Sequence, residues 1–434
     1  MVTVTSREAA LSALAAWRKN GAWPEAYLNS LVRREGMERR DAALTYRLVC
    51  GVIQNVTLCD RCISAYSSIP MNKIQPIVLD IIRIGVYQLC FMNRIPVHAA
   101  VSESVKLARK KANPSAAGFV NAILRKIAGQ GIPEIDTTDD IEYLSVKYSH
   151  PRWLTQRIVD ELGREDGERY LVCDNELAPV CAQVNTLKAT TDEVISSLAD
   201  EGVTVRKTMG GLELIGVGDP SDLTVFKNGS IFIQDNAANL AVRVADPKPD
   251  MRVLDGCAAP GGKSFAAAVM MENRGRILSR DIHEKKLVRI SREAARLGID
   301  IIETEAGDAR VLRPDMEKRF DVVIADVPCS GLGVIRKKPD IRFKKPEDIE
   351  GLPEIQLAIL TNLAKCCKPG GTVLYSTCTI LSRENGDVVR RFLSENSGYR
   401  LEPFDMSEDG MLTLYPHIHG TDGFFIARLR RDNE

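Results

Sequence analysis

The sequence predicts a chain of three parts: an all-helical domain over residues 1–135, a small α+β domain over 140–245 and an α/β domain over 246–434. Apolar residues recur at helical spacing in the first part, and short alternating runs end at glycines in the second. In the third part, segments typical of strands and of helices alternate. A length of 434 residues suits two or three domains of ordinary size.

The front part is predicted to be helical throughout. Apolar residues recur at the spacing of one helix face in 9–15, 44–53 and 77–86, and the pattern breaks at Pro96 and Pro114. These breaks predict several short helices packed together.

Three further stretches of this part, 82–89, 95–101 and 118–125, resemble the RNA-binding helical domain of the NusB type. The resemblance implies a basic face that contacts phosphates. Its candidate side chains are Lys106, Arg109, Lys110, Lys111, Arg125 and Lys126.

The middle part changes pattern. Strands are expected over 179–186, 203–206 and 212–215, with a helix over 192–199. Two prolines near 248 end this small α+β segment.

From residue 250 onward, the alternation of strands and helices favours a parallel sheet with helices on both faces. The strongly apolar run 320–326 is expected at the centre of the sheet. The runs 413–415 and 424–429 predict an antiparallel pair at an edge. The other strands are expected over 252–255, 275–281, 299–303 and 371–376, and the connecting helices over 284–297 and 357–367.

The charges are balanced in total but not along the chain. The chain holds 58 Lys and Arg against 58 Asp and Glu, which argues against a uniformly basic nucleic-acid-binding protein. Residues 1–135, however, hold 18 basic and 9 acidic side chains, a net of +9, which leaves −9 for 136–434. The neutral sum therefore leaves an RNA partner open.

The 11 cysteines, an odd number without regular spacing, argue against a disulfide framework. Cys59 and Cys62 form one Cys-x-x-Cys, but no second pair or nearby His completes a zinc site. We therefore expect buried thiols on a helix and no metal. No apolar run approaches the ~18 residues of a membrane span, so we expect no membrane association and a monomeric, cytoplasmic protein.

The stretch from Leu254 to Ser264 is the most informative in the sequence. It contains Gly261-Gly262-Lys263, follows a predicted strand and opens a helix, where free backbone N–H groups receive an anion or a carboxylate. A P-loop also ends in Gly-Lys-Ser, but it requires a Gly at the position of Cys257. A nucleoside triphosphatase is therefore not favoured.

Two aspartates follow neighbouring predicted strands. Asp281 lies 19 residues after Gly262, where an acid accepts hydrogen bonds from ribose hydroxyls. Asp308 is a second candidate, for the adenine amine. This geometry suits any adenosine cofactor and does not separate NAD from S-adenosylmethionine.

Two cysteines separate these alternatives. Cys329 follows the strand that ends at Asp326, and Cys378 follows the next strand, so both are expected at the carboxyl edge of the sheet, where ligands bind. Methylation of cytosine at carbon 5 requires such a thiolate, because addition of sulfur to carbon 6 converts the ring into an enamine that attacks an electrophilic methyl group. Asp326 is placed to protonate or hydrogen-bond the ring nitrogen.

The glycine loop, the Asp-x-Pro-Cys-Ser of 326–330 and the Ser-Thr-Cys-Thr of 376–379 together resemble the RNA cytosine-5 methyltransferases of the NOL/NSUN/Fmu type. The helical front domain, the run 333–342 and the Asp-Gly-Phe-Phe of 422–425 narrow the resemblance to the bacterial Sun/Fmu branch, which acts on small-subunit rRNA.

The resemblance implies a Rossmann-like domain that uses S-adenosylmethionine. It implies that Cys378 is the nucleophile, that Cys329 assists release of the product and that Lys263 lies near the cofactor and the target base. The residues implied to line the cofactor site are Cys257, Ala258, Ala259, Pro260, Gly261, Gly262, Lys263, Asp281, Asp308 and Asp326.

A basic stretch follows Cys329. We predict that it clamps phosphates beside the target base, although a solvated loop is the alternative. Its basic residues are Arg336, Lys337, Lys338, Arg342, Lys344 and Lys345.

The target base must leave its stack to reach Cys378, so the expected partner is a loop or an unfolded segment of small-subunit rRNA. The same chemistry on tRNA or another RNA stays open. A non-catalytic RNA-binding factor also stays open, although intact Cys378 and Asp326 argue against it.

Overall fold

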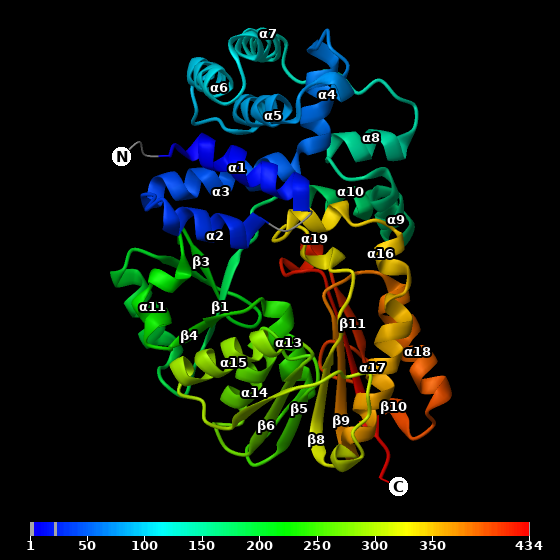
Figure 1. The fold of residues 1–434 in the computed structure, drawn as a ribbon. Helices are drawn as coiled ribbons and strands as arrows, with labels where there is room; N and C mark the ends of the chain where they lie inside the picture. The colour runs from blue at the N-terminus through cyan, green and yellow to red at the C-terminus, as the bar shows by residue number, and fades with distance from the viewer. Residues whose placement is uncertain (1–3, 21–23, 434) are drawn as a thin grey trace. The chain divides into compact units, whose positions relative to one another are not determined.

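The computed structural model describes residues 4–20 and 24–433 (Figure 1). The chain forms two compact units. The first comprises Met1–Glu176 together with Lys338–Phe343, and the second comprises Leu177–Lys337 and Lys344–Glu434.

The first unit is helical, as predicted. Its core is formed by apolar side chains of α1, α3, α4, α5, α6 and α7, with the apolar residues of α5 among the most completely buried. Local signals set the helix starts: α7, for example, begins with Pro114, and the side chain of Asn113 accepts a hydrogen bond from Ala116 N. The helices are α1 (Ser6–Asn20), α2 (Pro24–Arg34), α3 (Arg39–Gln54), α4 (Val56–Tyr66), α5 (Pro76–Phe91), α6 (Val97–Lys111), α7 (Pro114–Gln130), α8 (Asp140–Lys147), α9 (Arg152–Leu162) and α10 (Arg164–Cys173).

Helices α8, α9 and α10 belong to this helical unit. The predicted boundary between residues 135 and 140 therefore differs from the division that the structure shows. The reason is packing: α8–α10 bury apolar side chains such as Leu144 and Ile158, whereas the first strand of the next part begins only at Val180. Cys59 and Cys62 are buried on α4, as expected.

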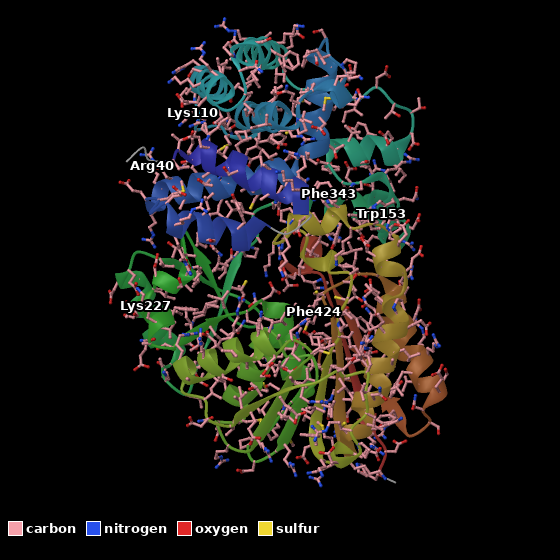
Figure 2. All side chains as sticks on the ribbon, in the orientation of Figure 1. Arg40, Lys110, Trp153, Lys227, Phe343 and Phe424 are labelled. Carbon is pink, nitrogen blue, oxygen red and sulfur yellow. The ribbon has the colours of Figure 1, made fainter. Side chains whose placement is uncertain are left out.

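A distant segment completes the first unit. The turn η5 (Pro339–Phe343) belongs to this unit (Phe343 is labelled in Figure 2). Phe343 packs edge-on against Trp17, with ring centroids 5.4 Å apart. The Arg342 side chain is fully buried and donates to the carbonyl oxygens of Gln54 at 2.6 Å and Ser149 at 3.0 Å.

The second unit begins with a small antiparallel sheet in the order β2-β3-β1-β4. The sheet and the helix beside it confirm the predicted α+β segment. A capping box formed by Thr190 and Glu193 starts the helix. The elements are β1 (Val180–Val184), α11 (Thr191–Asp200), β2 (Thr204–Lys207), β3 (Leu212–Ile215), η2 (Pro220–Asp222), α12 (Thr224–Lys227) and β4 (Ile231–Ile233).

The large sheet follows, in the order β10-β12-β9-β8-β5-β6-β7. Strands β9, β8, β5, β6 and β7 are parallel, and β8 is central, as its apolar sequence predicts. The strands are β5 (Arg252–Asp255), β6 (Arg276–Asp281), β7 (Ile302–Ala306), β8 (Phe320–Asp326), β9 (Cys367–Thr377), β10 (Tyr399–Leu401), β11 (Met411–Leu414) and β12 (Phe424–Arg431). The helices are α13 (Asn236–Ala245), α14 (Gly262–Met270), α15 (Glu284–Leu297), α16 (Glu347–Glu350), α17 (Leu352–Cys366), α18 (Gly386–Glu395) and α19 (Pro416–His419).

The predicted antiparallel pairing of the last two runs is confirmed, because β11 pairs with β12. Its expected position at an edge is wrong for β12, which lies between β9 and β10. Burial explains this position: Phe425, Ile426 and Ala427 of β12 are all buried, as an interior strand requires.

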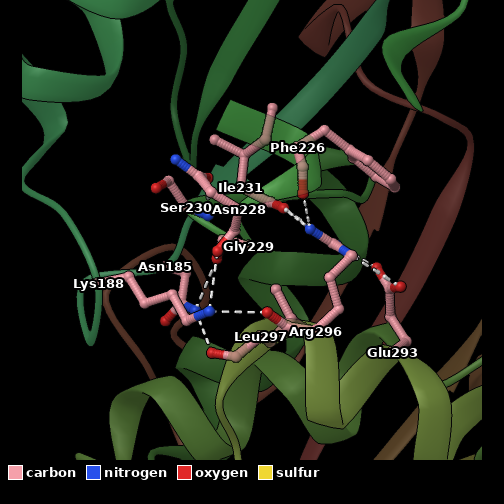
Figure 3. A network of polar contacts seen from close by, with 10 residues as sticks. All are labelled: Asn185, Lys188, Phe226, Asn228, Gly229, Ser230, Ile231, Glu293, Arg296 and Leu297. Carbon is pink, nitrogen blue, oxygen red and sulfur yellow. Dashed lines mark hydrogen bonds and ion pairs between the residues drawn. The ribbon is translucent and has the colours of Figure 1, made fainter. Parts of the chain in front are cut away.

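Polar contacts join the small sheet to α15 of the large sheet (Figure 3). The Arg296 guanidinium lies 3.9 Å from the ring centroid of Phe226 and donates to the carbonyl oxygen of Ile231 at 3.1 Å. Asn185 donates to the carbonyl oxygens of Gly229 at 2.9 Å and Leu297 at 2.8 Å. These contacts explain why the part of the predicted 140–245 domain that follows residue 176 forms one compact unit with the predicted 246–434 domain.

Among the described residues, no single helix is long and apolar enough to cross a membrane. Helices α3 and α4 reach that length and apolar composition only when taken together, and a bend of 75° separates them.

Candidate active site

The candidate site lies at the carboxyl edge of the large sheet. Strand β5 has β6 on one side and β8 on the other, so the chain order reverses beside it, and ligands of such sheets bind at this point. The glycine loop leaves β5, and α14 starts at Gly262, as predicted. Gly261 adopts a φ of +110°, where a side chain would also collide with Phe265 at 2.6 Å from the Cβ position.

Asp281 ends β6 and faces this loop. Its Oδ2 accepts a hydrogen bond from Ala259 N at 3.2 Å, and its Oδ1 accepts one from His283 N at 2.9 Å. The side chain is thereby oriented beside the glycine loop, in the position that an acid binding ribose hydroxyls requires.

Asp308 follows β7 and is only partly buried. Its carboxylate pairs with Arg310 at 2.7 Å, and the hydrogen bond from Arg310 lowers the pKa of Asp308. Part of its accepting capacity is thus already used within the protein.

The chemistry of these residues fits S-adenosylmethionine. Three carboxylates lie at one edge of the sheet: Asp281 ends β6, Asp308 follows the neighbouring β7, and Asp326 ends β8, on the other side of β5. Carboxylates accept hydrogen bonds from ribose hydroxyls and from an adenine amine, and they suit the positive charge of an ammonium and a sulfonium.

The two cysteines after β8 and β9 meet at this edge. The sulfur atoms of Cys329 and Cys378 lie 3.3 Å apart, although 49 positions separate them in the sequence. The hydrogen bond with Cys329 lowers the pKa of Cys378, whereas the same contact, reinforced by burial, raises the pKa of Cys329. The opposite directions of these two pKa shifts favour a thiolate on Cys378 and a thiol on Cys329.

Cys257 differs from this pair. Burial, followed by the charges of Asp255, Asp326 and other nearby carboxylates, raises its pKa. A thiol in this environment stays protonated, so Cys257 is a lining residue of the loop rather than a nucleophile.

Lys263 and Asp326 form an ion pair beside the cysteines. The Lys263 ammonium lies 2.7 Å from Asp326 Oδ2 and 5.0 Å from the ring centroid of Phe424 (Figure 2). Ser376 donates to the other oxygen of Asp326 at 2.7 Å. After the hydrogen bond with Cys329, which lowers the pKa of Cys378, burial and the charge of Asp326 raise it, and the positive charge of Lys263 opposes them.

The predicted phosphate clamp of residues 336–345 requires correction, because four of its six basic side chains are engaged inside the protein. Arg336 is buried beside Asp422, and Lys337 lies between Asp235 and Asp422. Arg342 is fully buried in the helical unit, as described above. Lys344 donates to the carbonyl oxygen of Ser330 at 2.6 Å.

Only Lys338 and Lys345 of this stretch are exposed. Arg336 and Arg342 are buried, and the partly buried Lys337 and Lys344 already have protein partners, so Lys338 and Lys345 are the side chains of the predicted clamp that stay free to contact a phosphate. The sequence gives the number of basic residues in this stretch, but it does not predict which carboxylates and carbonyl groups they contact in the folded protein.

Of the candidate basic residues of the front domain, Lys106, Arg109, Lys110 and Lys111 lie on α6, and the exposed Arg125 and Lys126 lie on α7 (Lys110 in Figure 2). Lys106 pairs with Glu103 at 2.7 Å, and Lys110 and Lys111 approach the buried Glu8 at 2.5 and 3.6 Å. Their ammonium groups remain accessible, so this face stays a prediction for RNA contacts.

Sequence reasoning missed a buried polar cluster formed by Gln356, Glu384 and Asn385. All three side chains are almost completely buried. The signal available in the sequence was the polar run Ser-Arg-Glu-Asn of 382–385, which follows Cys378 within a strongly apolar region. Buried polar side chains require partners, and here the partners are the two loops that carry the cysteines.

Among the described residues, no group of three or more His, Cys, Asp and Glu side chains is arranged to hold a metal ion.

Comparison with known proteins finds matches over all three parts of the chain. Residues 242–430 match the family model described as 16S rRNA methyltransferase RsmB/F, and residues 4–129 match the NusB family. Residues 150–220 match the ferredoxin-like domain of the RsmF/B-like methyltransferases.

Two curated relatives extend over most of the chain. The probable ribosomal RNA small subunit methyltransferase B of Bacillus subtilis is 36% identical, covering 99% of this chain and 100% of the relative. The ribosomal RNA small subunit methyltransferase B of Shewanella oneidensis is 32% identical, covering 90% of this chain and 91% of the relative.

Two solved structures are also similar. The crystal structure of PH0851 has a TM-score of 0.83 and 26% identity, covering 99% of each chain. The structure of NSun6 from Pyrococcus horikoshii with SFG has a TM-score of 0.60 and 23% identity, covering 65% of this chain and 99% of that one, and it supports the fold alone.

Proposed function

Since the chain belongs to the family of 16S rRNA methyltransferases RsmB/F and is an RNA methyltransferase that uses S-adenosylmethionine, we propose that it methylates carbon 5 of a cytosine in small-subunit rRNA. The single observation that carries the position of methylation is the pair of sulfur atoms 3.3 Å apart, beside Lys263 and Asp326. Methylation at an exocyclic nitrogen or a ribose oxygen has no use for a covalent thiol catalyst.

Cys378 is the proposed nucleophile. Its sulfur adds to carbon 6 of the cytosine, and the resulting enamine makes carbon 5 nucleophilic. The lowered pKa of Cys378 supports this role, because the thiolate is the reactive form.

Asp326 and Lys263 are proposed to act on the ring nitrogen. Asp326 contacts this nitrogen, and Lys263, 2.7 Å from its Oδ2, supplies positive charge and a proton to the pair. The negative charge that the ring gains when sulfur adds is thereby stabilised.

When bound, S-adenosylmethionine supplies the electrophilic methyl group. The residues proposed to bind it are the glycine loop with Asp281, Asp308 and Asp326, whose carboxylates face the carboxyl edge of the sheet. The loop leaves backbone N–H groups at the start of α14, which suit the carboxylate of the amino-acid part.

Release of the product requires loss of the carbon-5 proton and breakage of the carbon–sulfur bond, which returns the electron pair to Cys378. Cys329 is proposed to assist, because its sulfur lies 3.3 Å from that of Cys378. Once Cys378 is bonded to carbon 6 it no longer holds the proton on Cys329, so Cys329 gives this proton to solvent and, as a thiolate, takes the proton that leaves carbon 5. The mechanism uses no metal ion, so addition of EDTA is expected to leave the rate unchanged.

We further propose that the substrate is a loop or an unfolded segment, because the target base must leave its stack to meet Cys378. The exposed face of α6, with Lys106, Arg109, Lys110 and Lys111, is proposed to bind its phosphates. We take the protein to act as a monomer in the cytoplasm, which light scattering and cell fractionation would test.

Bisulfite sequencing tests the function. Recombinant protein, S-adenosylmethionine and small-subunit rRNA transcribed in vitro are incubated together, with a tRNA pool as a parallel substrate. A new 5-methylcytosine in the rRNA supports the proposal. If only the tRNA is modified, the reaction is the proposed one but the substrate is tRNA rather than rRNA. If neither RNA is modified, the proposal is contradicted.

A further inference from the structure

Glu384 is connected to the loop that carries Cys329. Its side chain is completely buried, and its Oε2 accepts a hydrogen bond from Ser330 N at 2.8 Å. Ser330 directly follows Cys329. The same oxygen accepts a second hydrogen bond from Gln356 Nε2 at 2.8 Å, and Gln356 also donates to the carbonyl oxygen of Pro328, on the other side of Cys329, at 3.1 Å.

The backbone around Glu384 is connected to the strand that leads to Cys378. Tyr375 donates its hydroxyl proton to the carbonyl oxygen of Glu384 at 2.6 Å. The next residue, Asn385, donates to the carbonyl oxygen of Thr379 at 3.0 Å and accepts from the hydroxyl of Thr377 at 2.6 Å. Thr377 and Thr379 are the two neighbours of Cys378.

The two loops also meet directly. The hydroxyl of Ser330 donates to the hydroxyl oxygen of Thr379 at 2.8 Å. Apart from the exposed Pro328, the residues that make these hydrogen bonds are buried, so their hydrogen bonds are shielded from water and loss of one leaves an unpaired polar atom.

We propose that Glu384 is a positioning residue that fixes the position of Cys329 relative to Cys378. The two sulfur atoms then stay close enough to each other to act on one cytosine ring. The proposal rests on the function proposed above. Its physical basis is that Glu384 accepts hydrogen bonds from both Ser330 N and Gln356. Ser330 follows Cys329, and Gln356 contacts Pro328, which precedes it, so the backbone is held on both sides of Cys329.

The negative charge of Glu384 favours the same arrangement of the two cysteines as its hydrogen bonds do, because it keeps Cys329 protonated. It adds to the effects of Cys378 and of burial in raising the pKa of Cys329. A thiol on Cys329 is the form that donates to Cys378, so the carboxylate supports the same arrangement that its hydrogen bonds create.

The separation of the sulfur atoms is measurable without any turnover. Diamide converts two adjacent thiols into a disulfide: the thiols lose two protons and two electrons, and diamide gains them to become the hydrazine. Mass spectrometry of the digested protein measures the rate at which the peptide joining Cys329 to Cys378 forms. The full chain is used throughout.

The first variant is E384A, which removes the acceptor of both hydrogen bonds. We expect the Cys329–Cys378 peptide to form about tenfold more slowly, since the hydrogen bonds lost are to a charged acceptor. We expect kcat to fall by a similar factor, with an unchanged KM for S-adenosylmethionine. E384Q is the conservative variant, and because its amide oxygen still accepts from Ser330 N, it is expected to recover most of the cross-linking rate.

The matched control is E402A. Glu402 is a partly buried carboxylate beside the large sheet, far in sequence from the cysteine loops, where it pairs with Arg428 at 2.7 Å and Arg430 at 2.9 Å. This variant is expected to cross-link and turn over as the wild type does, so it measures any effect of general destabilisation.

A wild-type cross-linking rate in E384A would overturn the positioning role, whatever the enzyme methylates. Slow cross-linking with normal kcat would overturn it as well, because the relative position of the two sulfur atoms would then not matter for the reaction. Failure of the proposed function alone appears differently, as altered cross-linking in E384A with no methylation of carbon 5 by the wild type.

If E384A does not fold, T379V decides the question. It removes the hydroxyl that accepts from Ser330 and keeps the shape of the side chain. Slower cross-linking than in the wild type supports the coupling of the two loops, and an unchanged rate overturns it.

Discussion

Lys337 donates to Asp422 Oδ2 at 2.6 Å, joining the segment that follows Cys329 to the Asp-Gly-Phe-Phe run at the end of the chain. Asp235, the N-cap of α13, accepts from the same ammonium at 2.8 Å. Close by, Gly423 N donates to the carbonyl oxygen of Gly333 at 2.8 Å, and Gly333 N donates to that of Cys378 at 2.9 Å. The ion pair therefore stabilises the backbone around Gly333, which is hydrogen-bonded to Cys378, the proposed nucleophile.

Lys337 and Lys338 are expected to behave differently despite being neighbours. K337A leaves Asp235 and Asp422 without their cation in a mostly buried position, so unfolding should become easier by roughly 3 kcal/mol. Lys338 and Lys345 are exposed and are the remaining candidates for phosphate contact, so K338A/K345A should keep the melting temperature.

For K338A/K345A, the salt dependence of RNA binding should become shallower by about 1.4 units in the log–log slope, since each of the two lost contacts to a single strand contributes about 0.7. Melting curves and fluorescence anisotropy at several salt concentrations measure the two effects. A K337A protein as stable as the wild type would contradict the structural role of Lys337.

C378A is expected to abolish methyl transfer, because no other thiol at the edge of the sheet has a lowered pKa beside the Lys263–Asp326 pair. Calorimetry should find S-adenosylmethionine binding unchanged. Transfer of radiolabelled methyl groups to rRNA measures activity, and retained incorporation would remove Cys378 from the mechanism.

C329S is expected to trap the RNA on the protein. The first step uses Cys378 alone, whereas release needs the group 3.3 Å from it. A covalent protein–RNA band should therefore accumulate in denaturing gels, and C329S/C378A, which lacks the nucleophile, is the control that should show none. Absence of the band in C329S, with activity lost, would argue against this division of roles.

D281N should weaken binding of S-adenosylmethionine about tenfold or more, since a charged acceptor of ribose hydroxyls is lost. D308N should weaken it less, because Asp308 already shares its carboxylate with Arg310. Isothermal titration calorimetry compares the two variants. Equal affinities for D281N and the wild type would remove the ribose contact from Asp281.

Asp255 is expected to make the protein less stable as the pH rises. Burial raises its pKa to about 7, whereas the unfolded chain has a value of about 3.9. The native carboxyl therefore holds its proton up to about pH 7, so the stability gained from that proton falls between about pH 4 and 7. Asp422, whose pKa burial raises to about 6, acts in the same direction.

D255N should reduce this fall in stability without abolishing it. Its side-chain oxygen can still accept from Ser264, which donates to Asp255 at 2.7 Å. Differential scanning fluorimetry at pH 5 and pH 8 measures the drop in melting temperature, and an identical drop in wild type and D255N would exclude Asp255 as its cause.

Elements with strong periodic signals were predicted well. The helices of the front domain, the apolar strand 320–326 and the helix after the glycine loop are confirmed because each depends on local pattern. The boundary near 140 and the edge position of the last strand differ from the structure, because both depend on which surfaces pack together, and no local pattern reports that.

The candidate site divides in the same way. The order of the strands placed Asp281, Asp326, Cys329 and Cys378 after the ends of parallel strands, and such ends share one edge of a sheet. The identity of the reacting groups therefore followed from residue types and their positions relative to the strands.

The sequence by itself determined the family, the helical and α/β parts and the chemistry that two cysteines and an aspartate make available. Only the tertiary structure decided which charges are free. Six basic residues in 336–345 look equivalent in the sequence, yet Arg342 is fully buried and Lys345 is exposed. Side-chain roles of this kind depend on partners distant in sequence, such as Asp422 for Lys337 and Glu384 for the Cys329 loop, which only folding brings within hydrogen-bond distance.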